Sequence, residues 1–131
     1  KNWYGLVEFY FNGLGEAHAA DVVSNTELMD RLRRGEIFVL GPLYASSLLE
    51  VELSPLFRLN ATFILNLEDG SALVQPTLRW DLASDLELIA GSTLATGSQG
   101  SEFGGFDLDT PSGQVSIAPP DSIFAWLTAS F

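Results

Sequence analysis

The feature that most constrains this chain is an alternation of apolar and polar residues that continues over segments of about ten residues. Between Phe57 and Leu67 every second residue is apolar, and polar residues such as Arg58 and Asn60 stand between them. Successive side chains of a β-strand point to opposite faces, so the pattern predicts a strand with one apolar and one polar face. The alternation favours antiparallel strands, either in a sheet or in a barrel.

The same alternation recurs along the chain between turn signals. Ser54-Pro55, Glu68–Ser71 and Ala83–Asp85 are short, turn-forming stretches that join neighbouring segments closely. We therefore expect strands at 3–12, 43–53, 57–67, 72–82, 86–96 and 122–131. Pro76 lies inside the fourth of these segments, where it removes a backbone donor, and it predicts a bulge or a locally missing hydrogen bond.

Two longer connections remain, at about 13–42 and 97–121. In the first, Ser24 followed by Glu27 predicts a capping box, and Gly35 predicts the C-terminal cap of one short loop helix. The arginines in its last turn suit the helix dipole, and we interpret this helix as a lid on the barrel mouth rather than as a basic binding patch. The second connection is rich in Gly, Ser and Asp, which predicts a polar outer loop outside any core.

The charges of the predicted strands obey one rule: all of them fall on the polar face. The charged residues are Glu8, Glu50, Glu52, Arg58, Arg79, Asp81 and Glu87. A Lys or Arg facing lipid costs roughly 2–4 kcal/mol at the bilayer midplane, so a membrane barrel must exclude such residues from its outer face. The segments also have about the 9–11 residues that cross a bilayer when tilted, whereas strands of soluble proteins average about 5–6. We therefore predict an all-β fold, a transmembrane antiparallel up-and-down β-barrel, with 1–131 as a single segment of it.

In such a barrel the polar face lines the lumen. The predicted lumen-facing residues are Glu50, Glu52, Arg58, Asn60, Gln75, Arg79, Asp81 and Glu87. Arg58 and Arg79 are expected to form cross-strand pairs with acidic residues. These side chains would set the selectivity of a wide pore or form a salt-bridged plug in a narrow one.

Aromatic residues support the same assignment of the apolar face to lipid. With the short turns on the periplasmic side, Trp3, Phe57, Trp80 and Phe131 all fall on the apolar face at the periplasmic end of their strands. Rings at that height are typical of an aromatic girdle at the membrane interface, so these four residues are predicted to face lipid there.

The final segment carries a family resemblance. Ile123, Ala125, Leu127, Ala129 and the terminal Phe131 match the last strand of Gram-negative outer-membrane β-barrel proteins, which ends in an aromatic residue preceded by apolar residues at every second position. The stretch 56–105, with Asn66-Leu-Glu-Asp-Gly-Ser71 and Ser101-Glu-Phe-Gly104, is also similar to uncharacterised porin-like barrel proteins. The resemblance implies the C-terminal region of such a barrel, located in the cell outer membrane, and indicates almost nothing about cargo.

About six strands are fewer than the roughly eight of the smallest familiar single-chain barrels. An open sheet edge in lipid leaves unpaired backbone groups that cost several kcal/mol each. We therefore expect the barrel to be completed by a missing N-terminal segment or by another chain, and expect outer-membrane lipid and lipopolysaccharide as its surroundings.

Residues for chemistry are few. His18 lies between Glu16 and Asp21, but one His without Cys is a weak metal site, and no nucleophile–base motif accompanies it. Gly100–Gly105 resembles a phosphate loop only superficially, and Glu102, Asp107 and Asp109 lack the spacing of a calcium loop, so a solvated acidic loop is the favoured interpretation. We predict no enzyme activity, metal or cofactor, and the net charge of -11 disfavours nucleic acid.

The predicted function is passive: a porin-like channel or a structural barrel. One alternative is a scaffold subunit of a larger envelope complex, which its loops or rim would contact. The other is a soluble, lipocalin-like barrel that keeps its apolar face inside and binds an apolar ligand.

Overall fold

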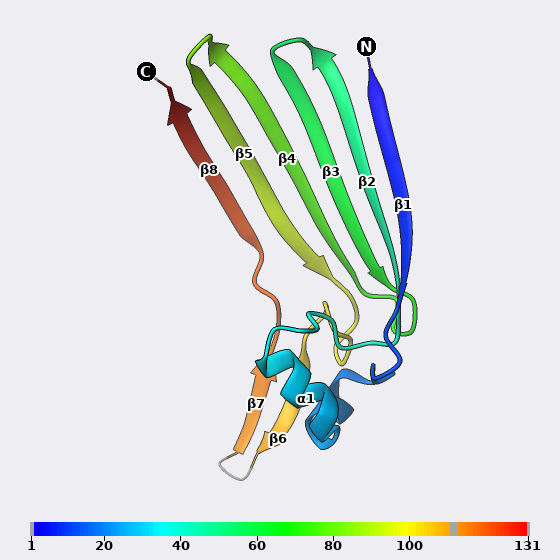
Figure 1. Cartoon of the computed structure of the whole chain (residues 1–131). Coiled ribbons are helices and arrows are strands. Elements are labelled where there is room, and N and C mark those ends of the chain that lie inside the picture. Colours follow the sequence, from blue (N-terminus) through cyan, green and yellow to red (C-terminus); the bar gives the residue numbers. More distant parts are fainter. Residues whose placement is uncertain (1, 111–112, 131) are drawn as a thin grey trace.

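The structure is a computed structural model that describes residues 2–110 and 113–130. Six strands form one antiparallel sheet in the order β1-β2-β3-β4-β5-β8 (Figure 1). Their bounds are Trp3–Phe11 (β1), Leu43–Ser54 (β2), Phe57–Asn66 (β3), Ala72–Ala83 (β4), Leu86–Thr96 (β5) and Ser122–Ala129 (β8). All six predicted strands are confirmed, and no bound differs from its prediction by more than two residues.

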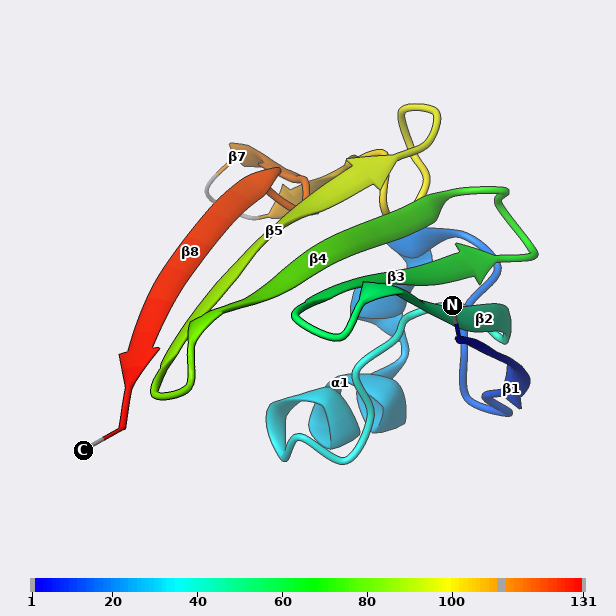
Figure 2. The same ribbon diagram turned by 90° about the horizontal axis from the view of Figure 1, so that it is seen from above.

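The sheet is curved and open. Among the described strands, β1 pairs only with β2 and β8 pairs only with β5, so each has one unpaired edge. Figure 2 shows the six strands as an arc, seen from the end that carries the short turns. The strands of residues 2–110 and 113–130 thus form an open antiparallel sheet and do not close into a barrel.

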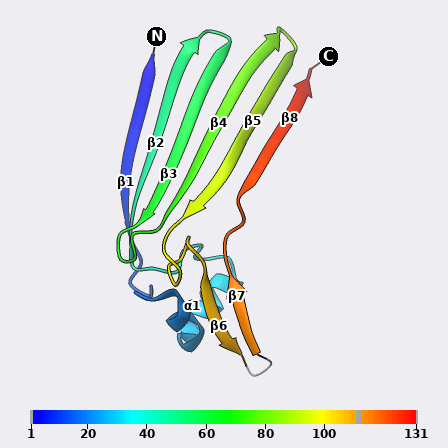
Figure 3. The ribbon, with the colours of Figure 1, turned by 180° about the vertical axis from the view of Figure 1, so that it is seen from behind.

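The two ends of the sheet differ. Both short turns and both ends of the described chain lie at one end, and the long connections and the β3–β4 hairpin lie at the other (Figures 1 and 3). The long connections carry a 3-10 helix η1 (Ala19–Ser24), the helix α1 (Thr26–Arg33) and a separate hairpin, β6 (Phe106–Thr110) with β7 (Gly113–Ile117). In the part of the chain that the structure describes, no helix is long and apolar enough to span a bilayer.

Two predictions about the long connections were wrong in detail. The N-cap of α1 is Asn25, whose side chain accepts from the Leu28 N–H, whereas the Ser24 hydroxyl donates to the Asp21 carbonyl. Asn25 can cap as well as Ser, and it lies one residue nearer to the first helical turn. The connection 97–121 is not a featureless loop, because it contains β6 and β7 and buries Phe106.

Packing is concentrated in the loop end. The buried apolar residues of the described chain are Ala19, Val22, Leu28, Tyr44 and Phe106, and all but Tyr44 lie outside the sheet. Many large apolar side chains on the sheet are exposed, from 37% for Leu65 to 89% for Ile123, and others, such as Phe57 and Leu78, are half-buried. The sheet therefore has no core of its own, which is the arrangement expected of a surface that another apolar medium covers.

Pro76 interrupts the pairing of β4 with β5. The register runs from Val74–Leu94 directly to Thr77–Gly91, and the two intervening pairs are absent without a register shift. The prediction of a locally missing hydrogen bond is thus confirmed. Gln75 bridges the gap from its side chain, where Nε2 donates to Thr93 Oγ1 at 3.2 Å.

Gly91 is required at this interruption, because β4 and β8 both approach it closely. A Cβ at Gly91 would lie 2.6 Å from Cζ of Phe124 and 2.7 Å from the carbonyl oxygen of Pro76. We expect Gly91→Ala to lower the free energy of unfolding by about 1–3 kcal/mol through overpacking. Urea titration of the refolded protein measures this loss. Ser92→Ala, which adds no atom, is the control, and equal losses in both variants would contradict the close-approach explanation.

Candidate functional site

The polar face of the sheet brings the predicted lumen residues together. Residues directly opposite each other in the register share a face, and Glu50 pairs with Asn60, Arg58 with Arg79, and Asp81 with Glu87. Glu52 lies opposite Arg58, and the Gln75 side chain reaches Thr93. All eight residues therefore lie on one face, together with Glu8; that this face lines a lumen stays a prediction.

This polar face is the concave side of the sheet. Tyr10, Tyr44 and Ile64 project from it and line one hollow with Glu36 and Phe38 of the segment that follows α1. Figure 2 shows α1 and this following segment inside the arc of the strands. The charged face is thus concave and the uncharged face is convex.

Both strand arginines are paired across strands, as predicted. Arg58 lies 3.6 Å from a carboxylate oxygen of Asp81, and Arg79 lies 3.4 Å from a carboxylate oxygen of Glu87. Each pair joins neighbouring strands diagonally near the short turns, and its partners are 29–43% exposed. Pairs this exposed stabilise the sheet only modestly, and their main effect is to neutralise both guanidinium groups.

Three acidic residues of the concave face have no basic partner among the described residues. Within residues 2–110 and 113–130, Glu8 and Glu50 form no ion pair, and the Glu52 carboxylate accepts from the amide of Asn2 at 2.9 Å. With five carboxylates against two guanidinium groups, the concave face carries an excess of three negative charges. Its electrostatic potential therefore attracts cations and repels anions.

The convex face holds part of the predicted girdle. Phe57 and Trp80 are cross-strand neighbours whose ring centroids lie 6.0 Å apart at an interplanar angle of 72°. Trp3 lies at the same end of the sheet, one row further from the turn, through the pairs Trp3–Val51 and Val51–Leu59. Phe131 lies outside the described residues, and the contact of these rings with lipid stays a prediction.

A buried carboxylate lies where the loop end meets the sheet. Glu102 is 7% exposed, and its Oε1 accepts the Leu40 N–H at 2.9 Å. Its Oε2 accepts the Asn66 side-chain amide at 2.9 Å and the Tyr44 hydroxyl. One side chain thus fastens the connection after β5 to β2, to β3 and to the segment that enters β2.

The β3–β4 hairpin holds the main chain of the same residue. One oxygen of Asp69 accepts the Glu102 N–H at 2.7 Å, and the other accepts the N–H and the hydroxyl of Ser71 at 2.8 and 2.6 Å. We call Glu102, Tyr44, Asn66, Asp69 and Ser71 the loop latch. The carboxylates of the loop latch accept hydrogen bonds from N–H and O–H donors, so the latch serves to hold the loops to the sheet.

The prediction that Glu102 belongs to a solvated acidic loop is therefore wrong. Its partners come from two regions, residues 40–44 and 66–69, that lie far from Glu102 in the sequence, and no local spacing signals such a cluster. Asp107 and Asp109 lie on β6 opposite Ser116 and Gln114. In residues 2–110 and 113–130, no group of three or more His, Cys, Asp or Glu is placed to hold a metal ion. His18 lies 3.9 Å from Asp21, and both side chains are exposed.

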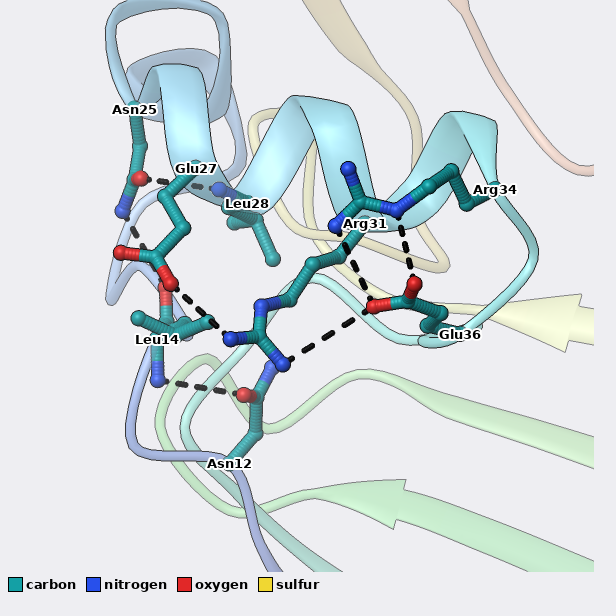
Figure 4. Close-up of polar contacts among 8 residues, drawn as sticks. All are labelled: Asn12, Leu14, Asn25, Glu27, Leu28, Arg31, Arg34 and Glu36. Carbon is teal, nitrogen blue, oxygen red and sulfur yellow. Dashed lines mark hydrogen bonds and ion pairs between the residues drawn. The ribbon is translucent and has the colours of Figure 1, made fainter.

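The helix α1 is fixed by polar contacts that Figure 4 shows. The Asn25 amide donates to the Leu14 carbonyl at 3.2 Å, which ties the start of the helix to the chain leaving β1. The same amide also donates to Glu16, which is not drawn in the figure, at 2.6 Å. Arg31 bridges Glu27 at 3.0 Å and Glu36 at 3.9 Å.

Arg34 donates from Nε to Glu36 at 2.7 Å, and this bond lowers the pKa of the Glu36 carboxyl. Two of the three arginines of this segment, Arg31 and Arg34, are thus neutralised by nearby acidic residues. The pairing supports the interpretation of the helix as a loop element rather than as a basic binding patch.

No protein-family model, curated protein or solved structure matches this chain.

Proposed function

We propose that this chain forms part of a β-barrel in a cell outer membrane, where it serves as a passive channel that prefers cations. Its convex face contacts lipid, and its concave face borders a water-filled passage. Outer-membrane lipid and lipopolysaccharide surround it, and the loop end with α1 and β6–β7 lies at the outer mouth.

The observation that carries the proposal is the division of charge between the two sides of a curved sheet. Every charge of the six strands lies on the concave face, and the convex face has none. A soluble, lipocalin-like barrel requires the reverse, because its apolar residues must lie inside and its charges outside. A membrane barrel requires the arrangement seen here.

The stagger of the strands gives separate support. The row that crosses the sheet from Trp3, the first residue of β1, reaches Ala125 in the middle of β8 through Val51, Leu59, Leu78 and Ala90. Successive strands are thus displaced by about one residue, which corresponds to a tilt of roughly 35° at the usual strand spacing. Barrel strands are tilted by about 35–45°.

The three tryptophans offer a direct test, because Trp80 is on the convex face and Trp126 is on the concave face, opposite Ile89. One variant keeps only Trp80 (Trp3→Phe with Trp126→Phe), and its matched control keeps only Trp126 (Trp3→Phe with Trp80→Phe). Both are refolded into vesicles whose lipid tails carry bromine, which quenches indole fluorescence on contact. We expect strong quenching of Trp80 and little quenching of Trp126.

Equal quenching of the two tryptophans would contradict the assignment of the faces. A protein that stays monodisperse without detergent, with an unquenched Trp80, would overturn the membrane proposal and favour the soluble carrier of an apolar ligand.

A cation preference is the second expected result. In a planar bilayer with a salt gradient, the reversal potential should have the sign of a cation-selective pore. Replacing both Glu50 and Glu52 with Gln lowers the excess of negative charge on the concave face from three to one, so most of the preference should be lost. Glu68→Gln, which removes an acid of the exposed β3–β4 hairpin, is the control and should leave the potential nearly unchanged. Anion preference of the unmodified protein would contradict the assignment.

A further inference from the structure

We propose that two copies of this chain close one barrel, with β8 of each copy pairing antiparallel to β1 of the other. The inference rests on the proposed function and adds the identity of the missing strands. Two copies of the six-stranded sheet give twelve strands, an even number as antiparallel closure requires. The two junctions are identical, as twofold symmetry requires.

The two open edges are where the sheet is most exposed. On β1, Trp3, Phe9 and Phe11 are 73–76% exposed, and on β8 Ile123 is 89% exposed, whereas Leu59, Phe63 and Leu65 on the central strand β3 are 37–41% exposed. Both edges also present unpaired backbone groups, which lipid cannot satisfy. Further strands must therefore cover both edges if the chain spans a membrane.

On both edge strands, the N–H and C=O groups that point into the sheet belong to residues of the same parity. The Glu52 N–H donates to the Asn2 carbonyl, and the Asn12 N–H donates to the Pro42 carbonyl, so the even-numbered residues of β1 direct their groups toward β2. The Ser130 N–H donates to the Asp85 carbonyl, so the even-numbered residues of β8 direct theirs toward β5.

On both edges the odd-numbered residues therefore point their N–H and C=O groups outward. The same odd-numbered residues carry the convex-face side chains. A register that places odd opposite odd satisfies the backbone and keeps the convex faces continuous at once.

One register also continues the stagger of the sheet. If Val7 of one copy lies opposite Leu127 of the other, each strand remains displaced by about one residue from its neighbour, and the tilt stays at roughly 35°. Shifting the pairing by two residues so that the stagger decreases lowers the strand tilt to roughly 25°, which is outside the range of tilts found in barrels. Shifting the pairing by two residues so that the stagger increases leaves the most exposed residue of β8, Ile123, beyond the end of β1.

The residue types that meet at this register are compatible. On the convex face the bulky Phe9 lies opposite Ala125, and Gly5 lies opposite Ala129. On the concave face Glu8 lies opposite Trp126 and Tyr10 opposite Phe124, so no like charges meet. The junction thus meets the same rules as the strand pairs inside the sheet.

Cysteine cross-linking tests the junction, because the chain contains no cysteine. A tagged chain with Val7→Cys is refolded into vesicles together with an untagged chain carrying Leu127→Cys, and a short bis-maleimide is added. We expect a mixed dimer that contains both chains. The control replaces the second chain with one carrying Ile123→Cys, which is more exposed than Leu127 but lies four residues away in the proposed register.

The mixed dimer with Leu127→Cys and its absence with Ile123→Cys support the proposal. Equal products with both partners indicate collision and overturn the register. No product with either partner overturns closure by a second copy and assigns the edges to strands outside residues 1–131. The tryptophan quenching described above decides the membrane proposal separately, so a quenched Trp80 without a mixed dimer would leave the proposed function standing and remove only this inference.

Discussion

Phe63→Arg is expected to lower the free energy of unfolding in lipid vesicles by about 3 kcal/mol, the largest loss predicted for a single change on the sheet. Phe63 lies on the convex face of β3, opposite Ser47 and Val74 and well away from both short turns. Under the proposed function a guanidinium at this position would face lipid, where no counterion or water is within reach. Urea titration of the refolded protein measures the change.

Thr62→Arg is the matched control for this substitution. Thr62 is the preceding residue of the same strand, and its side chain lies on the concave face opposite Leu48 and Gln75. Under the same proposal an arginine there would meet water and an excess of acidic residues, so we expect a change within about 0.5 kcal/mol, as for ordinary surface substitutions. Similar losses from both arginines would mean that the two faces of β3 have the same surroundings, which contradicts the lipid assignment.

Glu102→Ala is expected to release the connection after β5 from the sheet. The substitution leaves the Leu40 N–H, the Tyr44 hydroxyl and the Asn66 amide without their acceptor in a buried place. At about 1–3 kcal/mol for each unsatisfied buried group, we expect local stability to fall by about 3 kcal/mol or more. Faster hydrogen exchange at the Leu40 amide and faster proteolysis near residue 102 are the measurements.

Two further variants make the test specific to the loop latch. Glu102→Gln keeps one acceptor oxygen and nearly the same volume, so its effect should be smaller than that of Glu102→Ala. Glu68→Ala removes an exposed acid of the same hairpin and should leave exchange at Leu40 unchanged. Unchanged exchange in Glu102→Ala would show that the carboxylate does not hold the connection.

The strands could be predicted from the sequence because their signal is local. Alternation fixes which residues share a face, and Ser54-Pro55 and Ala83–Asp85 fix where strands end, so the cross-strand ion pairs of Arg58 and Arg79 followed from counting alone. The interruption at Pro76 could also be predicted, because proline lacks a backbone N–H wherever it stands in the sequence.

The loop latch could not be predicted in the same way. Glu102 meets Asn66, which is 36 residues away, and Tyr44, which is 58 residues away, and nothing near Glu102 marks it as buried. The acidic, glycine-rich composition around it is typical of solvated loops, and only the fold shows where its partners lie. The prediction of the N-cap was wrong by one residue, because Ser24 and Asn25 are adjacent and both residue types are good caps.

The position of the latch also bears on the order in which the sheet forms. Strands β1 to β5 each pair with the strand next to them in the chain, so these contacts need only short loops or, once, the connection before β2. The pairing of β8 with β5 must instead close the whole stretch 97–121, and the entropy lost in closing a loop grows with the number of free residues. Because Glu102 is fastened to the β3–β4 hairpin and β6 folds back on β7, little of that stretch stays free. We therefore expect a connection that is already folded to speed the docking of β8, so that the docking rate depends on residue 102 at a distance.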